Sequence, residues 1–85
     1  MTEETGKEEN LAELQRLVAM GEKAYDDMYE VHSQREIDAC YRDAKEWYYE
    51  AIALARRLGL DAEVGTLLNR LEHIKAVFRH QFSGA

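Results

Sequence analysis

Hydrophobic residues recur every three or four positions along most of this chain, which is the period of an amphipathic helix. The recurrence is most regular in the middle, at Ile37, Cys40, Ala44, Trp47, Ala51, Leu54 and Leu58. An earlier set lies at Leu11, Leu14, Val18, Gly21, Tyr25, Met28 and His32, and a later set lies at Val64, Leu67, Leu71, Ile74 and Phe78. The pattern therefore predicts three helices, each with one buried face.

The middle helix carries signals for both of its ends. Ser33 and Glu36 have the spacing of a capping box, in which the serine oxygen accepts from a free backbone N–H and the glutamate reaches back to the cap. At the other end, Gly59 can adopt the left-handed conformation that closes a helix, and Asp61 can cap the next helix. We therefore expect the middle helix to begin at Ser33 and to end near Leu58.

The junction between the first two helices has neither proline nor glycine over residues 31–35, so a continuous helix from Leu11 to Leu58 is an alternative. Extending the first apolar face beyond His32 argues against this alternative. The positions that it reaches are mostly charged: Arg35, Ala39, Arg42 and Glu46. We therefore predict a turn, helped by the cap at Ser33.

Short connections make consecutive helices antiparallel neighbours, so the expected fold is all-α, an antiparallel up-down-up three-helix bundle. The bundle should form a single domain over residues 10–82, because 85 residues leave room for one domain. Residues 1–9 are acidic and lack an apolar anchor, so we expect a disordered tail there, with Asn10 capping the first helix. Residues 83–85 should fray. Gly21 should either kink the first helix or let another helix approach closely.

The net charge of −6 argues against general binding to nucleic acid or to an anionic membrane, because both require clustered positive charge. The charge is uneven, since residues 1–50 hold 14 acids and 6 bases while residues 51–85 hold 3 acids and 5 bases. No run approaches the ~20 apolar residues that span a bilayer, and no apolar signal segment opens the chain. Cys40, the single cysteine, cannot form an internal disulfide. We expect a soluble protein of a reducing compartment, which in a bacterial host is the cytoplasm.

The residues that could carry metal or catalytic chemistry lack the required spacing. His73 and His80 would lie about 10.5 Å apart along a helix, too far to share one zinc ion. The chain has no glycine-rich phosphate loop, and no serine with a histidine and an acid at a recognisable spacing. Cys40 lies on an apolar face, where a cysteine behaves as a small inert hydrophobe. We therefore expect no enzyme activity, no cofactor and no metal.

The apolar arc of the middle helix is roughly 160° wide, more than the ~100° stripe of an ordinary surface helix. Two interpretations stay open: a central helix that packs against two others, or an exposed groove that binds a partner. Tyr49 falls on the polar face of this helix and Tyr29 at the edge of the first apolar face, where tyrosines can contact a partner. The candidate partner-binding residues are Tyr29, Tyr41, Tyr48, Tyr49, Ile52, Arg70 and His73.

The chain resembles two families of helical proteins over about residues 41–71. Three stretches of this segment read Ala44-x3-Tyr48-x2-Ala51, Leu54-Ala55-Arg56-Arg57-Leu58-Gly59 and Leu67-Leu68-Asn69-Arg70-Leu71. Together they resemble the second helix of one tetratricopeptide repeat followed by the first helix of the next repeat. The text Ala44-x3-Tyr48-x2-Ala51-Ile52 is also similar to the middle helix of microtubule-interacting-and-transport domains. The first resemblance implies stacked hairpins that bind peptides in a concave groove. The second implies a single three-helix bundle that binds helical peptides between its helices.

These observations favour a small non-enzymatic module that binds a partner helix or peptide through apolar anchors and charged rims. The alternative is a self-associating protein whose excess apolar surface closes a homodimer, with no peptide ligand. A third hypothesis is contact with an anion or nucleic acid through the basic positions of the last helix, which are Arg70, His73, Lys75 and Arg79.

Overall fold

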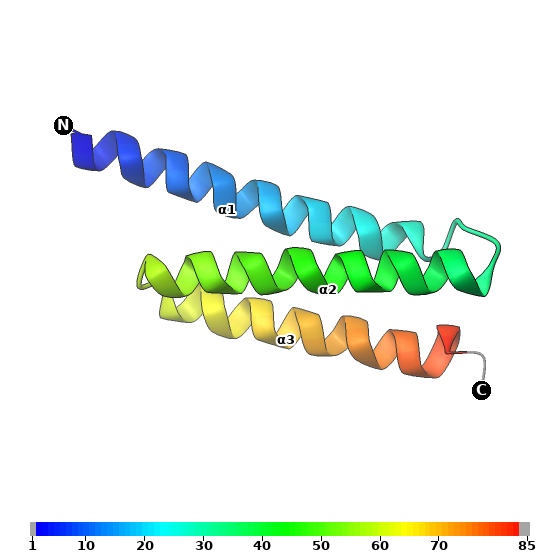
Figure 1. Cartoon of the computed structure of the whole chain (residues 1–85). Helices are drawn as coiled ribbons and strands as arrows, with labels where there is room; N and C mark the ends of the chain where they lie inside the picture. The colour runs from blue at the N-terminus through cyan, green and yellow to red at the C-terminus, as the bar shows by residue number, and fades with distance from the viewer. Residues whose placement is uncertain (1, 84–85) are drawn as a thin grey trace.

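The computed structural model describes residues 2–83, with side chains from residue 6 onward. Its elements are α1 (Thr2–Asp27), α2 (Gln34–Arg57), α3 (Asp61–Val77) and a π-helical turn, η1 (Phe78–Phe82), that continues α3. The helices run up, down and up (Figure 1), and no strand occurs within the described range. The predicted all-α, antiparallel three-helix bundle is confirmed.

The central helix is α2, which lies between α1 and α3 in an elongated molecule with principal extents of 52 × 20 × 13 Å (Figure 1). Ala44, Ala51 and Ala55 of α2 are fully buried, and side chains this small let both neighbouring helices approach. Larger side chains complete the core: Leu14, Leu17, Tyr25, Met28, Tyr48, Ile52, Leu54, Leu67, Leu71 and Ile74. The wide apolar arc of α2 therefore serves packing against two helices.

The predicted turn before α2 is present, and Ser33 caps the helix as expected. The side-chain oxygen of Ser33 accepts a hydrogen bond from the backbone N–H of Glu36 at 3.1 Å. The Ser33 hydroxyl in turn donates to the Glu36 carboxylate at 3.0 Å. In a standard capping box, this carboxylate would accept from the backbone N–H of the cap residue instead. The Ser33 hydroxyl thus makes both hydrogen bonds of the cap, one with the backbone and one with the side chain of Glu36.

The end of α2 is a glycine-closed turn, also as predicted. Gly59 has a φ of +73°, its N–H donates to the Arg56 carbonyl at 3.1 Å, and the N–H of Leu60 donates to the Ala55 carbonyl at 2.9 Å. This pair of bonds is a Schellman motif. The prediction that Asp61 caps the next helix is wrong, because the apolar Leu60 occupies the cap position and packs against the core. As the first residue of α3, Asp61 still places a negative charge at the positive end of the helix.

The N-terminal segment differs from the expected disordered tail. Since α1 begins at Thr2, residues 2–9 are helical, and Asn10 lies inside the helix and does not cap it. Glutamate and lysine have good helix propensity, and acidic side chains near an N-terminus interact favourably with the helix dipole. Residue 1, and all but the first residue of the frayed end expected at 83–85, lie outside the described residues.

Gly21 brings α1 and α2 close together, which is the second of the two roles predicted for it. A Cβ atom at this position would lie 2.7 Å from two ring carbons of Tyr48, closer than such atoms pack. The Tyr48 side chain is itself fully buried, so its ring has little room to move. The contact between α1 and α2 therefore requires glycine here.

Candidate functional site

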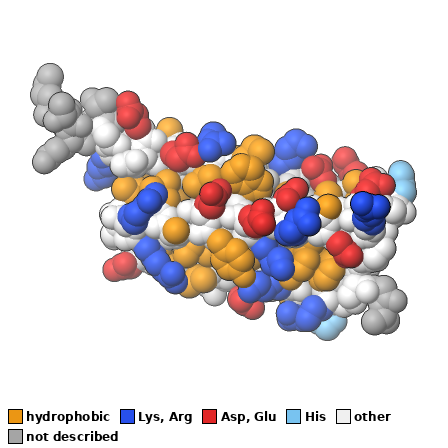
Figure 2. Space-filling view, in the orientation of Figure 1, with side chains coloured by type: hydrophobic (Ala, Val, Ile, Leu, Met, Phe, Trp, Pro, Cys, Tyr) orange, Lys and Arg blue, Asp and Glu red, His pale blue; other side chains and the backbone are white. Residues whose placement is uncertain are grey.

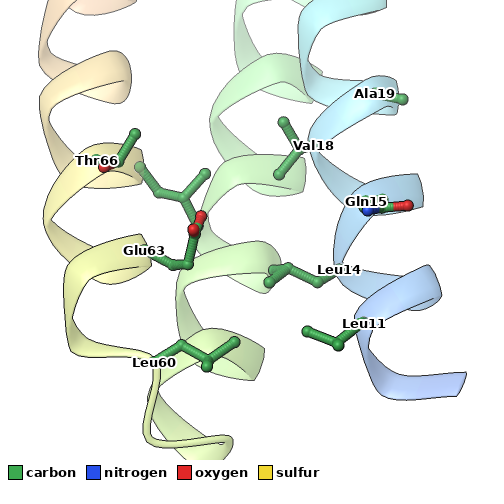
Figure 3. Close-up of a pocket in the computed structure, with 9 residues that line it drawn as sticks. Leu11, Leu14, Gln15, Val18, Ala19, Leu60, Glu63 and Thr66 are labelled. Carbon is green, nitrogen blue, oxygen red and sulfur yellow. The ribbon is translucent and has the colours of Figure 1, made fainter. Parts of the chain in front are cut away.

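An apolar groove separates the first half of α1 from the start of α3 (Figure 3). We call it the α1–α3 groove; its volume is about 520 Å³, and it is lined by Leu11, Leu14, Gln15, Val18, Ala19, Leu60, Glu63, Thr66 and Leu67. Leu14 and Leu67 are buried, whereas Leu11, Val18 and Leu60 stay half-buried along the walls. The polar residues among the lining are exposed and form the rim. The groove therefore offers an apolar interior with a polar edge, the form of a site for an apolar ligand surface.

A second hollow continues the groove toward the N-terminus of α1. It has a volume of about 370 Å³ and shares Leu11 and Leu60 with the groove. Its other lining residues are Lys7, Asn10 and Leu58. The groove is therefore open at this end, which we call the open end.

The other end of the groove is closed by an ion pair between α1 and α3. Arg70 donates two hydrogen bonds to the Glu22 carboxylate, from Nε at 2.8 Å and from a terminal nitrogen at 2.7 Å. The hydroxyl of Tyr48, from α2, donates to the same carboxylate. All three helices thus meet at one carboxylate, a geometry that fixes their relative positions more firmly than a single surface ion pair does.

The pKa values in this network follow from its contacts. The hydrogen bonds from Arg70 hold the pKa of Glu22 below its ordinary value, against an opposing effect of burial. The same pairing raises the pKa of Arg70. Burial and the hydrogen bond to Glu22 raise the pKa of the Tyr48 hydroxyl. The Glu22 carboxylate is therefore ionised at neutral pH, and the Tyr48 hydroxyl is neutral. The network links the three helices, and neither group has a pKa shifted toward neutrality, as acid–base catalysis would require.

Aromatic side chains pack together beyond the Glu22–Arg70 ion pair, at the same end of the bundle. Tyr25 packs edge-to-face on Tyr29 with ring centroids 5.6 Å apart, and the two hydroxyls are 3.1 Å apart. Tyr29 packs in turn on Phe82 at 5.0 Å, and Tyr25 on His73 at 6.4 Å. Arg70 lies 5.1 Å above the Tyr25 ring, and burial raises the Tyr25 pKa to about 12. We call this cluster, together with the Glu22–Arg70 pair and Tyr48, the closed end.

The start of α2 is joined to η1 at the same end of the bundle. Gln34 donates from its side-chain nitrogen to the Phe82 carbonyl at 2.6 Å. The ring of Tyr41 stacks on Phe78 with centroids 3.8 Å apart and an interplanar angle of 5°. The π-helical turn is thereby held against α2 as well as against Tyr29 in the turn that follows α1.

A mixed surface of charged and apolar side chains covers the face of the molecule shown in Figure 2. Positive and negative side chains alternate there, and apolar side chains gather along the seams between helices (Figure 2). A shallow hollow of about 390 Å³ lies among Glu46, Trp47, Tyr49 and Glu50. The two aromatic rings of this hollow already make cation–π contacts within the protein. Arg16 lies 5.9 Å from the centroid of the Trp47 ring, and Lys75 lies 5.6 Å from the centroid of the Tyr49 ring. We therefore regard the α1–α3 groove as the better candidate site.

The candidate residues chosen from the sequence do not assemble into one surface. Tyr48 and Ile52 are core residues, 1% and 3% exposed, so they have almost no surface to offer a partner. Tyr29 and Tyr49 are about half exposed, at 53% and 50%, but Tyr29 packs on η1 and Tyr49 lies by Lys75 of α3.

The remaining three candidates have partners inside the fold. Tyr41 is half-buried under Phe78, and Arg70 is paired with Glu22. His73 is exposed and lies against Tyr25. None of the seven lines the α1–α3 groove.

The apolar residues of the groove walls are visible in the sequence, but no pattern marks them as only half-buried. Leu11 and Val18 belong to the apolar face predicted for α1, and a bundle with three equal contacts would bury them. Leu60 follows the closing glycine, and the sequence predicts no role for it. The missing information is the separation of α1 from α3 at the open end, which no local pattern encodes.

The described part of the chain shows no group of three or more His, Cys, Asp or Glu residues that could hold a metal ion. Cys40 is half-buried, and burial raises the pKa of its thiol, which lowers its reactivity. Over residues 2–83 we find no helix with both the length and the apolar character needed to cross a membrane.

Comparisons with protein-family models, with curated proteins and with solved structures found no match to this chain.

Proposed function

We propose that this protein is a small non-enzymatic interaction module that binds a partner helix or peptide in the α1–α3 groove. The observation that carries the proposal is the groove itself, an apolar hollow of about 520 Å³ between two helices, which lies beside a buried core. Apolar walls supply affinity and a polar rim supplies orientation in helix-in-groove recognition. The resemblance to two families of peptide-binding helical modules supports the same role.

A peptide-display selection on the intact chain tests the proposal. Peptides selected on the wild-type chain should lose about tenfold or more in affinity for Val18→Trp, because Val18 points into the hollow (Figure 3) and an indole in its place occupies the space that a ligand would use. Val31→Trp is the matched control, since Val31 is a half-buried valine between α1 and α2, outside the groove. Selected peptides that bind Val18→Trp as well as wild type would contradict the proposal.

Self-association is the competing hypothesis, and the fold removes much of the surface that it would use. The apolar arc of α2, including Tyr48 and Ile52, is buried within one chain. Light scattering across micromolar concentrations should therefore give the mass of a monomer, 9.9 kDa. A dimer mass that persists on dilution would favour the homodimer.

We also propose a cytoplasmic, reducing location, on the ground that the single cysteine is a half-buried free thiol. Localisation of a tagged chain by cell fractionation checks this proposal.

A further inference from the structure

We propose that the occupant of the α1–α3 groove is a short amphipathic helix that lies antiparallel to α1 and α3 and carries positive charge in its last turn. This inference rests on the proposed function and adds the conformation, the charge and the direction of the partner. Three properties of the groove carry it: its helical walls, the acidic residue Glu63 in its lining, and the shared direction of the two helices that border it.

The helical walls favour a helical ligand. Beyond the first turn of α3, the backbone N–H and C=O groups of both walls are paired within their own helices, and the Thr66 hydroxyl already donates to the Ala62 carbonyl at 3.1 Å. An extended peptide would bring unpaired backbone groups into an apolar groove with few partners, which is costly. A helix satisfies its own backbone and presents apolar side chains three and four residues apart. The walls therefore fit a helix better than a strand.

The length of the groove limits the length of the occupant. From Leu11 to Ala19 the α1 wall extends about 12 Å, given the rise of ~1.5 Å per helical residue. Beyond Ala19 the Glu22–Arg70 pair bridges α1 and α3 and closes the groove. About eight residues of a partner helix, a little over two turns, fill this distance, so a peptide of about twelve residues covers the groove with one further turn.

The charge around the groove favours a basic partner. Residues 7–19 of α1 and the segment 60–67 hold five acids and two bases. Glu13 and Arg16 pair with each other beside a hollow between α1 and α2, and the other base, Lys7, lines the second hollow. Glu63 lines the groove directly. A second copy of this chain, with a net charge of −6, would add negative charge, whereas lysine or arginine on a partner helix complements the rim. The charge thus distinguishes a basic partner from self-association.

The direction of the bordering helices favours an antiparallel partner. Both helices run from the open end toward the closed end, and α3 begins at Asp61 beside the groove without a side-chain cap on its free N–H groups (Figure 3). A partner running the opposite way places its carbonyl end near these N–H groups. The same direction brings the positive residues of its last turn beside Glu63. Shape and charge therefore agree on one orientation.

Two helix-stabilised peptides of about twelve residues test the inference, with the same leucine face and the same composition. One carries its lysines in the last turn and the other in the first turn. Fluorescence anisotropy should show about fivefold tighter binding of the first peptide, because a rim charge contributes modestly. A spin label at its C-terminus should broaden the methyl signals of Leu11 and Leu60 more than that of Leu71.

Two variants of the protein separate the charge at the groove from net charge. Glu63→Lys should weaken binding of the last-turn peptide about fivefold, because attraction is replaced by repulsion. Glu46→Lys makes the same change at an exposed residue of α2 outside the groove and should alter affinity less than about twofold.

The outcomes distinguish the inference from the proposed function. Equal binding of the two peptides, equal effects of Glu63→Lys and Glu46→Lys, or broadening at the closed end would overturn the inference and leave a helix-binding groove standing. Failure of both peptides to bind, together with no binder from the display selection, would overturn the proposed function. A mass that doubles with concentration, without peptide, would assign the groove to a second copy.

Discussion

The two ends of this bundle use the same three helices differently. At the closed end, α1 and α3 are joined across α2 by the Glu22–Arg70 ion pair and by the packing of Tyr25 on His73. At the open end, the same two helices face each other across an apolar groove. One end thus holds the fold together, and the other leaves apolar surface that a partner can cover.

The difference follows from the lengths of the side chains that face the gap. Arginine and aromatic side chains are long enough to make contact between α3 and α1, as Arg70 does with Glu22 and His73 does with Tyr25. The groove positions hold shorter side chains, such as Val18, Ala19 and Thr66, which do not fill the space. Stability and binding are therefore expected to separate along the length of the molecule, and substitutions can test that separation.

The largest expected contrast is between a leucine of the core and a leucine of the groove. Leu71→Ala should lower the free energy of unfolding by about 3 kcal/mol, because Leu71 is 2% exposed and its truncation leaves a cavity. Leu11→Ala, at the half-buried wall of the groove, should cost about 1 kcal/mol or less. Urea denaturation measures both values. Equal costs would show that the groove is packed as tightly as the core.

The next contrast is between two glycines inside helices. Gly21→Ala should lower the free energy of unfolding by about 1–2 kcal/mol, because the steric cost of a Cβ atom against Tyr48 exceeds the gain in helix propensity. Gly65→Ala meets no atom within 4 Å and should raise the free energy of unfolding by about 0.5–1 kcal/mol. Opposite signs in thermal denaturation are the expected result, and two stabilised variants would show that α1 and α2 do not meet closely.

A smaller effect is expected from the ion pair itself. Glu22→Gln should lower the free energy of unfolding at pH 7 by about 1 kcal/mol, a value reduced because both partners keep about a third of their side-chain surface in water. The control Glu46→Gln changes an exposed residue of α2 and should have an effect of less than about 0.5 kcal/mol.

The pH dependence of unfolding sharpens that prediction. Arg70 holds the pKa of folded Glu22 below its ordinary value of 4.5, so ionised Glu22 contributes stability above pH 4.5. This contribution is lost as the pH falls below 4.5 through the lower folded value. The difference in stability between wild type and Glu22→Gln should therefore shrink in acid, and a difference that grows in acid would contradict the ion-pair account.

The sequence was sufficient for the fold because its signals are local. Ser33 and Gly59 define the two ends of α2 through bonds within a few residues, and the period of apolar residues fixes the buried face. The prediction that Asp61 caps α3 is wrong because it too relies on a local preference. Capping propensity favours aspartate over leucine, but the closing turn after Gly59 places Leu60 at the cap and against the core.

The candidate site was less predictable because it depends on how two distant helices are spaced. The sequence predicts Tyr48 as a partner-binding residue, yet Gly21 on another helix leaves a space that the Tyr48 ring fills. Arg70 is predicted as a basic contact residue, but it pairs with Glu22, which is 48 positions away in the sequence. The groove between Val18 and Thr66 is likewise a property of tertiary packing, and no spacing within one helix reports it.

The most direct test of the central claim is a methyl NMR titration of the intact chain with the peptide that carries lysines in its last turn. The account predicts that the methyl signals of Leu11, Val18 and Leu60 shift together and saturate, while those of Leu71 and Ile74, buried in the core, stay in place. Shifts centred on residues outside the groove, with the three groove residues unchanged, would contradict it.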